Sequence, residues 1–238
     1  ITSIITDVSA SAGIRHRMDN GWRMDFNNTY GKNFFHYDIK NTINASLEEA
    51  SPTEFDAGGH SISQNTTGLD FSKYYKDVMA GANLAFGMEY RTENFIIFSG
   101  EEGSYAIYDE NGQAVTSPSQ VIPVDPITGE ERPGGSQGFP GYSVANKVDK
   151  NRSNLGVYGD GELNLSDNLL VSGAMRFEHY SDFGNTTNFK GAFRYKIAEG
   201  LAVRGSISTG FRAPSLAQVY YNLRFTNFVG GTAEEVLL

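Results

Sequence analysis

The sequence of 238 residues contains no cysteine, which excludes disulfide-stapled folds and sites where cysteine holds zinc or an iron–sulfur cluster. It also has no apolar run near the roughly 18 to 20 residues that a membrane-spanning helix needs, and its mean hydropathy is -0.37. Basic clusters are missing too, and the net charge is -9. Without a basic cluster, the chain has no positively charged surface of the kind that binds nucleic acid. Without a long apolar run, a helical membrane protein is excluded.

None of these absences excludes a membrane β-barrel. Its strands need only about 9 to 11 residues to cross the hydrocarbon, and every second residue is polar. The 27 Gly, 13 Tyr and 16 Phe beside a single Trp suit such walls, in which glycine relieves crowding and aromatic rings lie at the interfaces. A soluble β-sandwich has a similar composition. The order of apolar and polar residues along the chain is therefore needed to distinguish it from a membrane barrel.

The clearest pattern is a two-residue period in the last quarter of the chain. Apolar side chains from Phe189 to Ile197 alternate with polar ones, and after Glu199-Gly200 the alternation resumes from Leu201 to Ile207. These two runs predict a β-hairpin. Similar alternation predicts further strands over 22–30, 82–98, 155–164 and 169–178, and a weaker pattern covers 1–18.

The predicted connections alternate in length. Those expected to be short lie at 19–21, 76–79, 166–168 and 199–200, those expected to be long at 41–64 and 101–151, and a medium one at 181–186. In an up-and-down meander every second connection lies at the same end, so the short turns share one rim and the long loops the other. Outer-membrane barrels show this asymmetry. The predicted fold is all-β, an antiparallel meander of about eight strands that forms part of a larger transmembrane β-barrel.

Each hairpin gives the barrel wall two distinct faces. The apolar set is expected to face lipid and the charged set the lumen. The lipid set is Leu84, Phe86, Met175, Phe189, Phe193, Tyr195, Leu201 and Val203, and the lumen set is Glu162, Arg176, Arg194, Lys196 and Arg204.

Two segments resemble a known family. The stretch Ser206–Tyr220 resembles a signature in the barrels of TonB-dependent outer-membrane receptors; its motif residues are Gly210, Phe211, Arg212, Ala213, Pro214, Ser215 and Leu216. The stretches Ala85–Arg91 and Gly100–Tyr105 look like a strand that leads to an outer loop in the same family.

The resemblance implies a transporter of the bacterial outer membrane, not an enzyme. It implies a 22-stranded barrel in contact with lipid, closed by an N-terminal plug, that takes up a siderophore, haem, cobalamin or glycan with energy from TonB. Residues 1–238 show neither plug nor TonB box, so they are expected to be one internal segment of the barrel that self-associates in isolation. Two alternatives stay open: a complete eight-stranded barrel with a structural or adhesive role, and a soluble β-sandwich binding module.

The expected binding residues lie in the second long loop and on the lumen face. Tyr105, Tyr108, Phe139 and Tyr142 are able to stack on a ligand, and Arg176 and Arg204 are candidate contacts deeper in the pore. The loop itself is mainly acidic. His36 and His60 lack the partners of a metal site, and neither a nucleophile–base pair nor a cofactor motif is present.

Overall fold

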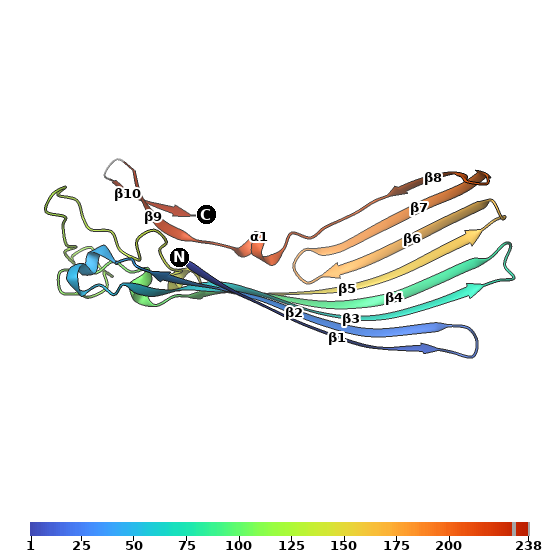
Figure 1. Cartoon of the computed structure of the whole chain (residues 1–238), viewed down its shortest axis with the longest axis horizontal. Coiled ribbons are helices and arrows are strands. Elements are labelled where there is room, and N and C mark those ends of the chain that lie inside the picture. The colour runs from blue at the N-terminus through green and yellow to red at the C-terminus, as the bar shows by residue number, and fades with distance from the viewer. Residues whose placement is uncertain (230–231, 238) are drawn as a thin grey trace.

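In the computed structural model, which describes residues 1–229 and 232–237, eight antiparallel strands form one sheet in chain order (Figure 1). The strands are β1 (Thr2–Arg17), β2 (Arg23–Lys40), β3 (Glu54–Tyr75), β4 (Ala82–Ser99), β5 (Val148–Asn164), β6 (Leu169–Tyr180), β7 (Gly184–Ala198) and β8 (Leu201–Ser208). Each pairs only with its neighbours in the sequence, so the sheet of the described residues is open and ends at β1 and β8. The predicted meander of eight strands is confirmed.

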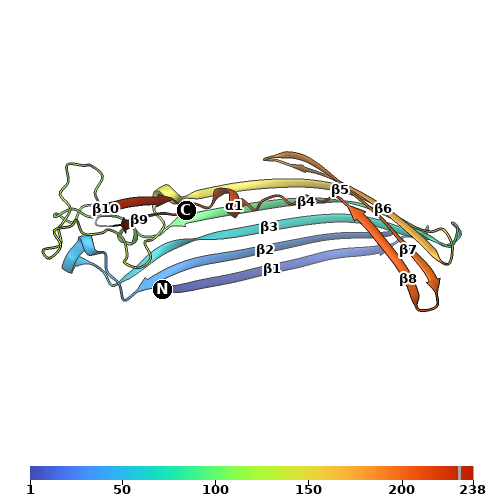
Figure 2. The same cartoon turned by 90° about the horizontal axis from the view of Figure 1, so that it is seen from above.

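The two ends of the sheet differ as the loop lengths predict. Short turns join β1 to β2, β3 to β4, β5 to β6 and β7 to β8, and Figures 1 and 2 show them gathered at one end of the molecule. The connections 41–53 and 100–147 lie at the opposite end and contain three short 3₁₀ helices, Ala45–Ala50, Glu102–Ser104 and Val144–Asn146. No helix among the described residues is long and apolar enough to cross a membrane.

Both long loops are shorter than predicted, because the strands run further than their apolar alternation. Residues 54–64 belong to β3 and residues 148–151 to β5, where composition predicts loop. These parts pair along their length with β2 and β4. A strand that projects beyond a bilayer has water on its outer face and needs no apolar period there. Ladder hydrogen bonds maintain both extensions, and β3 also buries Phe55 and Ala57.

Register places the two predicted sets of side chains on opposite faces. Phe189 lies opposite Met175, and Phe193 opposite Val171, so the apolar residues of β6 and β7 share one face. Arg194 lies opposite Arg204 on the other face. At the turn end the apolar face carries Trp22, which meets Phe86 edge-on with ring centroids 5.4 Å apart. Every residue of the two predicted sets follows this parity.

After β8 the chain leaves the wall as a segment that we call the inner strap, residues 209–223. It contains the short helix α1 (Leu216–Tyr220), which contacts β4 and β5, and Figure 1 shows it on the side toward which the sheet curls. Ser215 caps the helix: its hydroxyl accepts from the Gln218 N–H, and the Gln218 side chain accepts from the Ser215 N–H. Beyond the strap, β9 (Arg224–Val229) pairs with β10 (Thr232–Leu237).

The buried apolar residues lie near the loop end and not in the middle of the sheet. One cluster contains Phe95, Ile97, Tyr142, Leu216 and Leu223, and joins the wall, the second loop and the inner strap. A second cluster contains Ile39, Phe55 and Ala57. The turn end is a single layer with its apolar side chains exposed.

Candidate functional site: the outer loops and the inner strap

The two long loops are tied to each other at their base by one buried asparagine. Asn44 is fully buried, and its side-chain amide donates to the carbonyl oxygens of Gly103 and Ala106, both at 2.9 Å. Its Oδ1 accepts from Ser46, whose Oγ in turn accepts from the Tyr108 N–H at 2.9 Å. Each of these buried polar groups has a hydrogen-bond partner, so the network holds the two loops together at their base.

Above this base a cavity of about 600 Å³ opens between the loops. Its charged lining is mainly acidic: Glu48, Glu49, Asp109 and Glu110, with Arg132 as the one cation in that lining. The Arg132 guanidinium lies 3.3 Å from the Glu48 carboxylate, which neutralises both. The remaining charge of the cavity is negative, as the loop composition predicts.

The four aromatic residues predicted to stack on a ligand divide into two pairs. Tyr142 is fully buried and Tyr108 is 9% exposed, so both serve packing and neither offers a face to a ligand. Burial raises the pKa of both phenols, and Glu102 adds to the effect at Tyr108. Tyr105 and Phe139 are half-buried and remain predictions as contacts. The Phe139 ring already packs against the Tyr37 ring, with ring centroids 4.9 Å apart.

The two predicted lumen arginines are in different electrostatic states. Arg176 is paired with Glu89 at 3.3 Å and with Glu178 at 3.1 Å, so its charge is compensated within the wall. Arg204 is exposed and faces Arg194 across the β7–β8 ladder. Among the described residues no carboxylate lies within 4.0 Å of the guanidinium group of Arg204 or of Arg194. Only Arg204 of the predicted pair is therefore available to an anion.

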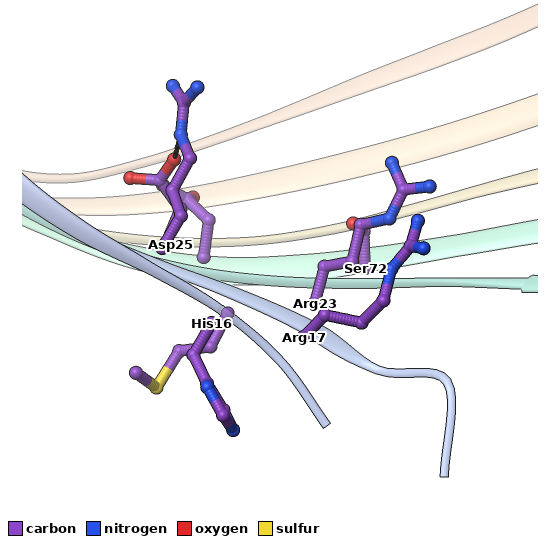
Figure 3. A pocket seen from close by; sticks show the side chains of 8 residues that line it. His16, Arg17, Arg23, Asp25 and Ser72 are labelled. Atoms are coloured by element: carbon purple, nitrogen blue, oxygen red, sulfur yellow. Dashed lines mark hydrogen bonds and ion pairs between the residues drawn. The ribbon is translucent and has the colours of Figure 1, made fainter. Parts of the chain in front are cut away.

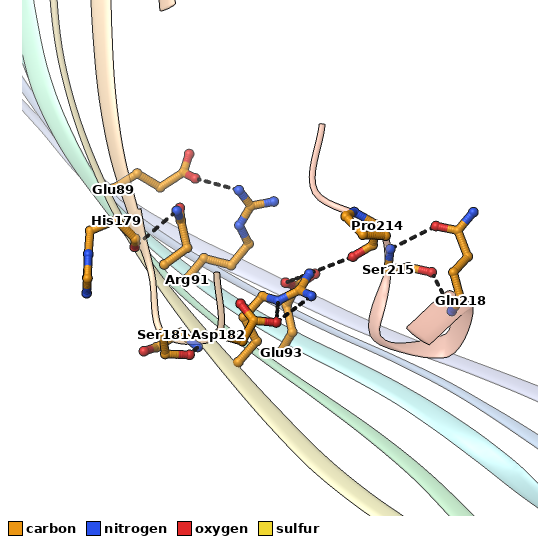
Figure 4. Close-up of polar contacts among 12 residues, drawn as sticks. Glu89, Arg91, Glu93, His179, Ser181, Asp182, Pro214, Ser215 and Gln218 are labelled. Carbon is orange, nitrogen blue, oxygen red and sulfur yellow. Dashed lines mark hydrogen bonds and ion pairs between the residues drawn. The ribbon is translucent and has the colours of Figure 1, made fainter. Parts of the chain in front are cut away.

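Sequence reasoning missed the cation that holds the motif against the wall. Arg152 is 3% exposed; its guanidinium donates to the Asp182 carboxylate at 2.7 Å and to the Pro214 carbonyl at 2.7 Å. Figure 4 shows these contacts between the wall and the strap. The guanidinium also lies 5.5 Å from the centre of the Phe183 ring. No motif marks Arg152, because its neighbours come together only in the folded sheet.

Comparison with known families agrees with three features of the structure: the antiparallel meander, the long loops at one end of the sheet, and the motif 210–216 on its inner side. The sequence matches the family described as "TonB dependent receptor-like, beta-barrel" over residues 3–235. The chain belongs to the TonB-dependent receptor family. Members of this family are outer-membrane transporters of Gram-negative bacteria and not enzymes.

One curated relative of this TonB-dependent receptor chain is the Vitamin B12 transporter BtuB of Vibrio vulnificus (strain CMCP6). The two are 34% identical over 73 residues, which cover 31% of this chain and 12% of the relative. The aligned part is therefore a small share of that transporter. Within the described residues of the receptor chain no group of three or more His, Cys, Asp or Glu side chains is arranged to hold a metal ion.

At the turn end of this receptor wall a pocket of about 430 Å³ is rich in arginine (Figure 3). Arg15 is paired with the Asp25 carboxylate. Arg17 and Arg23 are direct cross-strand partners, and no described carboxylate lies within ion-pair distance of either. Figure 3 shows both on the side of the sheet that carries Asp25, opposite His16. Two like charges directly opposite each other destabilise a ladder.

Arg23→Glu is therefore expected to stabilise the first hairpin, by roughly 0.2 to 1 kcal/mol. The gain should shrink as salt rises, because exposed charges are screened. Urea unfolding of the intact receptor in detergent, at low and high ionic strength, measures it. Arg23→Gln is the matched control and should give a smaller gain. A loss of stability with Arg23→Glu would contradict the interpretation that the two arginines repel each other.

The second loop should loosen in acid around Asp109. The carboxylate accepts from the Gln120 side chain and from the N–H groups of Gln113 and Asn111, each at 2.9 Å, and these bonds hold the Asp109 pKa below its usual range. A lowered folded-state pKa stabilises the loop above the unfolded pKa of about 3.9, and this contribution is lost as pH falls through the folded value. Amide hydrogen-exchange protection over 109–121 should fall below about pH 4. In Asp109→Asn this fall should be absent.

Proposed function

We propose that the intact receptor containing this chain imports a scarce nutrient across the outer membrane with energy from the TonB system. The observation that supports this is membership of the TonB-dependent receptor family across residues 3–235. In this proposal the strands supply part of the wall, and the loops 41–53 and 100–147 face the exterior. In the same proposal the TonB system acts through a plug and TonB-box segment outside residues 1–238, and outer-membrane lipid covers the apolar face.

Among the four ligand classes, a cobalamin is the first to test. The Vibrio relative, a Vitamin B12 transporter, supports it. The acidic cavity between the loops argues against an anionic ferric siderophore, which it would repel. Of the two predicted lumen arginines, Arg176 does not offset that repulsion, because Glu89 and Glu178 already neutralise it, and among the described residues only Arg204 is left to do so. Haem and glycans remain as comparison ligands.

The test is uptake by cells that carry or lack the receptor. Labelled cyanocobalamin should accumulate only with the receptor, and an uncoupler of the proton gradient should abolish accumulation but leave surface binding. Unlabelled haem, a ferric siderophore and an oligosaccharide serve as competitors. Uptake that does not depend on the receptor or the proton gradient would overturn the transport proposal. Competition by another class alone would replace cobalamin as the ligand.

The two alternatives lack support in the fold. A complete small barrel requires β1 to pair with β8, and these strands are the two unpaired edges of the sheet. A β-sandwich requires a second sheet that covers the apolar face. The described residues instead leave that face exposed, including Phe189 at 54% and Ile207 at 81%.

A further inference from the structure

Two arginines lie next to each other at the turn end of the sheet. Arg17 and Arg23 are direct partners across the β1–β2 ladder, which places their Cβ atoms about 4.5 to 5.5 Å apart. Both are exposed, and among the described residues no carboxylate lies within ion-pair distance of either. Figure 3 shows their guanidinium groups extending from the same side of the sheet. The pair therefore concentrates two positive charges at one place.

The strand register places this pair on the lumen side of the wall. Arg23 shares its face of β2 with Asp25, which lies opposite Asp70 of β3. The Asp70 carboxylate accepts from the Tyr158 hydroxyl at 2.6 Å, and Tyr158 is the cross-strand partner of Arg176 in the predicted lumen set. Because side chains alternate in direction along a strand, the arginine pair faces the lumen with them.

The carboxylates that line the same pocket already have partners. Asp25 is paired with Arg15, and Asp70 accepts from Tyr158. Three arginines and two aspartates line this pocket of about 430 Å³, so its formal charge is positive. The Ser72 hydroxyl lies in the same lining and offers a neutral donor. The chemistry of the pocket is therefore that of a site for an anion.

We propose that Arg17, Arg23 and Ser72 form a binding site for a small tetrahedral oxyanion of the phosphate class. A guanidinium group presents forked N–H donors that match the oxygens of a phosphate, and one phosphate accepts from two such groups at once. The bound anion also relieves the repulsion between two like charges on paired strands. The site lies at the opposite end of the wall from the acidic cavity and is independent of the imported solute.

The first arm measures the local electrostatic potential with a thiol. The chain has no cysteine, so Ser72→Cys adds a single reporter to residues 1–238, and the intact receptor without it gives the background rate. In detergent the thiol at position 72 should react several-fold faster with an anionic methanethiosulfonate than with the cationic analogue, after correction for their intrinsic rates. Replacing Arg17 and Arg23 together with Gln should abolish the preference, and replacing both with Lys should keep it. A preference that persists in the Gln variant would overturn the assignment.

The second arm uses inorganic phosphate as the probe, exchanged for chloride at constant ionic strength. Phosphate should slow the reaction of Ser72→Cys with a neutral maleimide several-fold and in a saturable way, because the bound anion covers the thiol. The matched control is Ser11→Cys, exposed on the same face of β1, whose rate should not change. Arg17→Gln with Arg23→Gln should remove the protection. Slowing that does not saturate, or that is equal at both positions, would be a general salt effect and would overturn the site.

The third arm measures binding through stability. At ten times the half-protecting phosphate concentration, a ligand that binds one site on the folded receptor shifts the unfolding equilibrium constant about tenfold toward the folded state. Urea unfolding of the intact receptor in detergent should show this shift at constant ionic strength. Arg23→Gln should lose most of it. An equal shift in Arg23→Gln would contradict binding at this pair.

A carboxylate from a part of the protein outside residues 1–238 is the other source of an oxyanion. In that case phosphate would give no protection in the intact receptor, and the slow reaction of Ser72→Cys would accelerate when Arg17 and Arg23 are both replaced with Gln. That result would overturn the proposal of a site for a free oxyanion. Saturable protection by phosphate that requires both arginines would establish it.

Discussion

Replacing Tyr142 with alanine is expected to weaken the outer part of the protein by about 3 to 5 kcal/mol, the usual cost of removing a buried aromatic side chain. Tyr142 is fully buried and touches two other parts of the chain: β4 through Phe95 and Ile97, and the inner strap through Leu216 and, by its hydroxyl, Tyr221. Its loss leaves a cavity and an unpaired tyrosine. Hydrogen exchange over 139–146 and 216–223 should accelerate by about two to three orders of magnitude, because each 1.4 kcal/mol is a factor of ten and part of the cost is relieved by relaxation.

The matched control is Tyr105→Ala in the same loop. Tyr105 is half-buried and belongs to neither buried cluster, so its exchange effect should be confined to its own turn. Tyr142→Phe separates packing from hydrogen bonding, because it keeps the ring and loses only the bond to Tyr221. A Tyr142→Ala receptor with unchanged exchange in the strap would mean that the loop and the strap are not energetically connected.

Replacing Phe193 with arginine is the second large effect that we expect. Phe193 is 45% exposed on the apolar face of β7, opposite Val171 and beside Phe189 and Tyr195. A cation on the lipid side of a barrel costs roughly 2 to 4 kcal/mol near the bilayer midplane. Folding titrations of the intact receptor into phospholipid vesicles measure the difference.

The neighbouring residue gives the control for this lipid-facing assignment. Ala192 has the opposite parity and faces the lumen between Ser172 and Ser206. Ala192→Arg should stay within about 0.5 kcal/mol, as is usual for a water-facing substitution. If both arginines are tolerated equally, the assignment of faces is wrong.

Sequence reasoning succeeded where lipid imposes a period. Around Phe193 each residue either faces hydrocarbon or faces water, and that alternation made the strands and their faces predictable. It failed over 54–64, where the polar, glycine-containing sequence of β3 shows no apolar period, although the strand is paired along its length and buries Phe55 and Ala57. It also failed at Tyr142 and Arg152. Whether an aromatic ring or a guanidinium is buried depends on contacts between residues such as 152, 182 and 214, which are distant in the sequence.

Because the buried clusters lie only near the loops, the two halves of the protein shield their apolar side chains in different ways. Near the loops, side chains such as Phe95 and Leu216 pack against each other, so this half has a hydrophobic core of its own. Toward the turns the wall is one layer thick, and Leu84, Met175 and Phe193 stay exposed on its apolar face. For this half the bilayer takes the place of a hydrophobic core. The thickness and composition of the lipid therefore act on the turn half as core packing acts elsewhere, and leave the loop half largely unaffected.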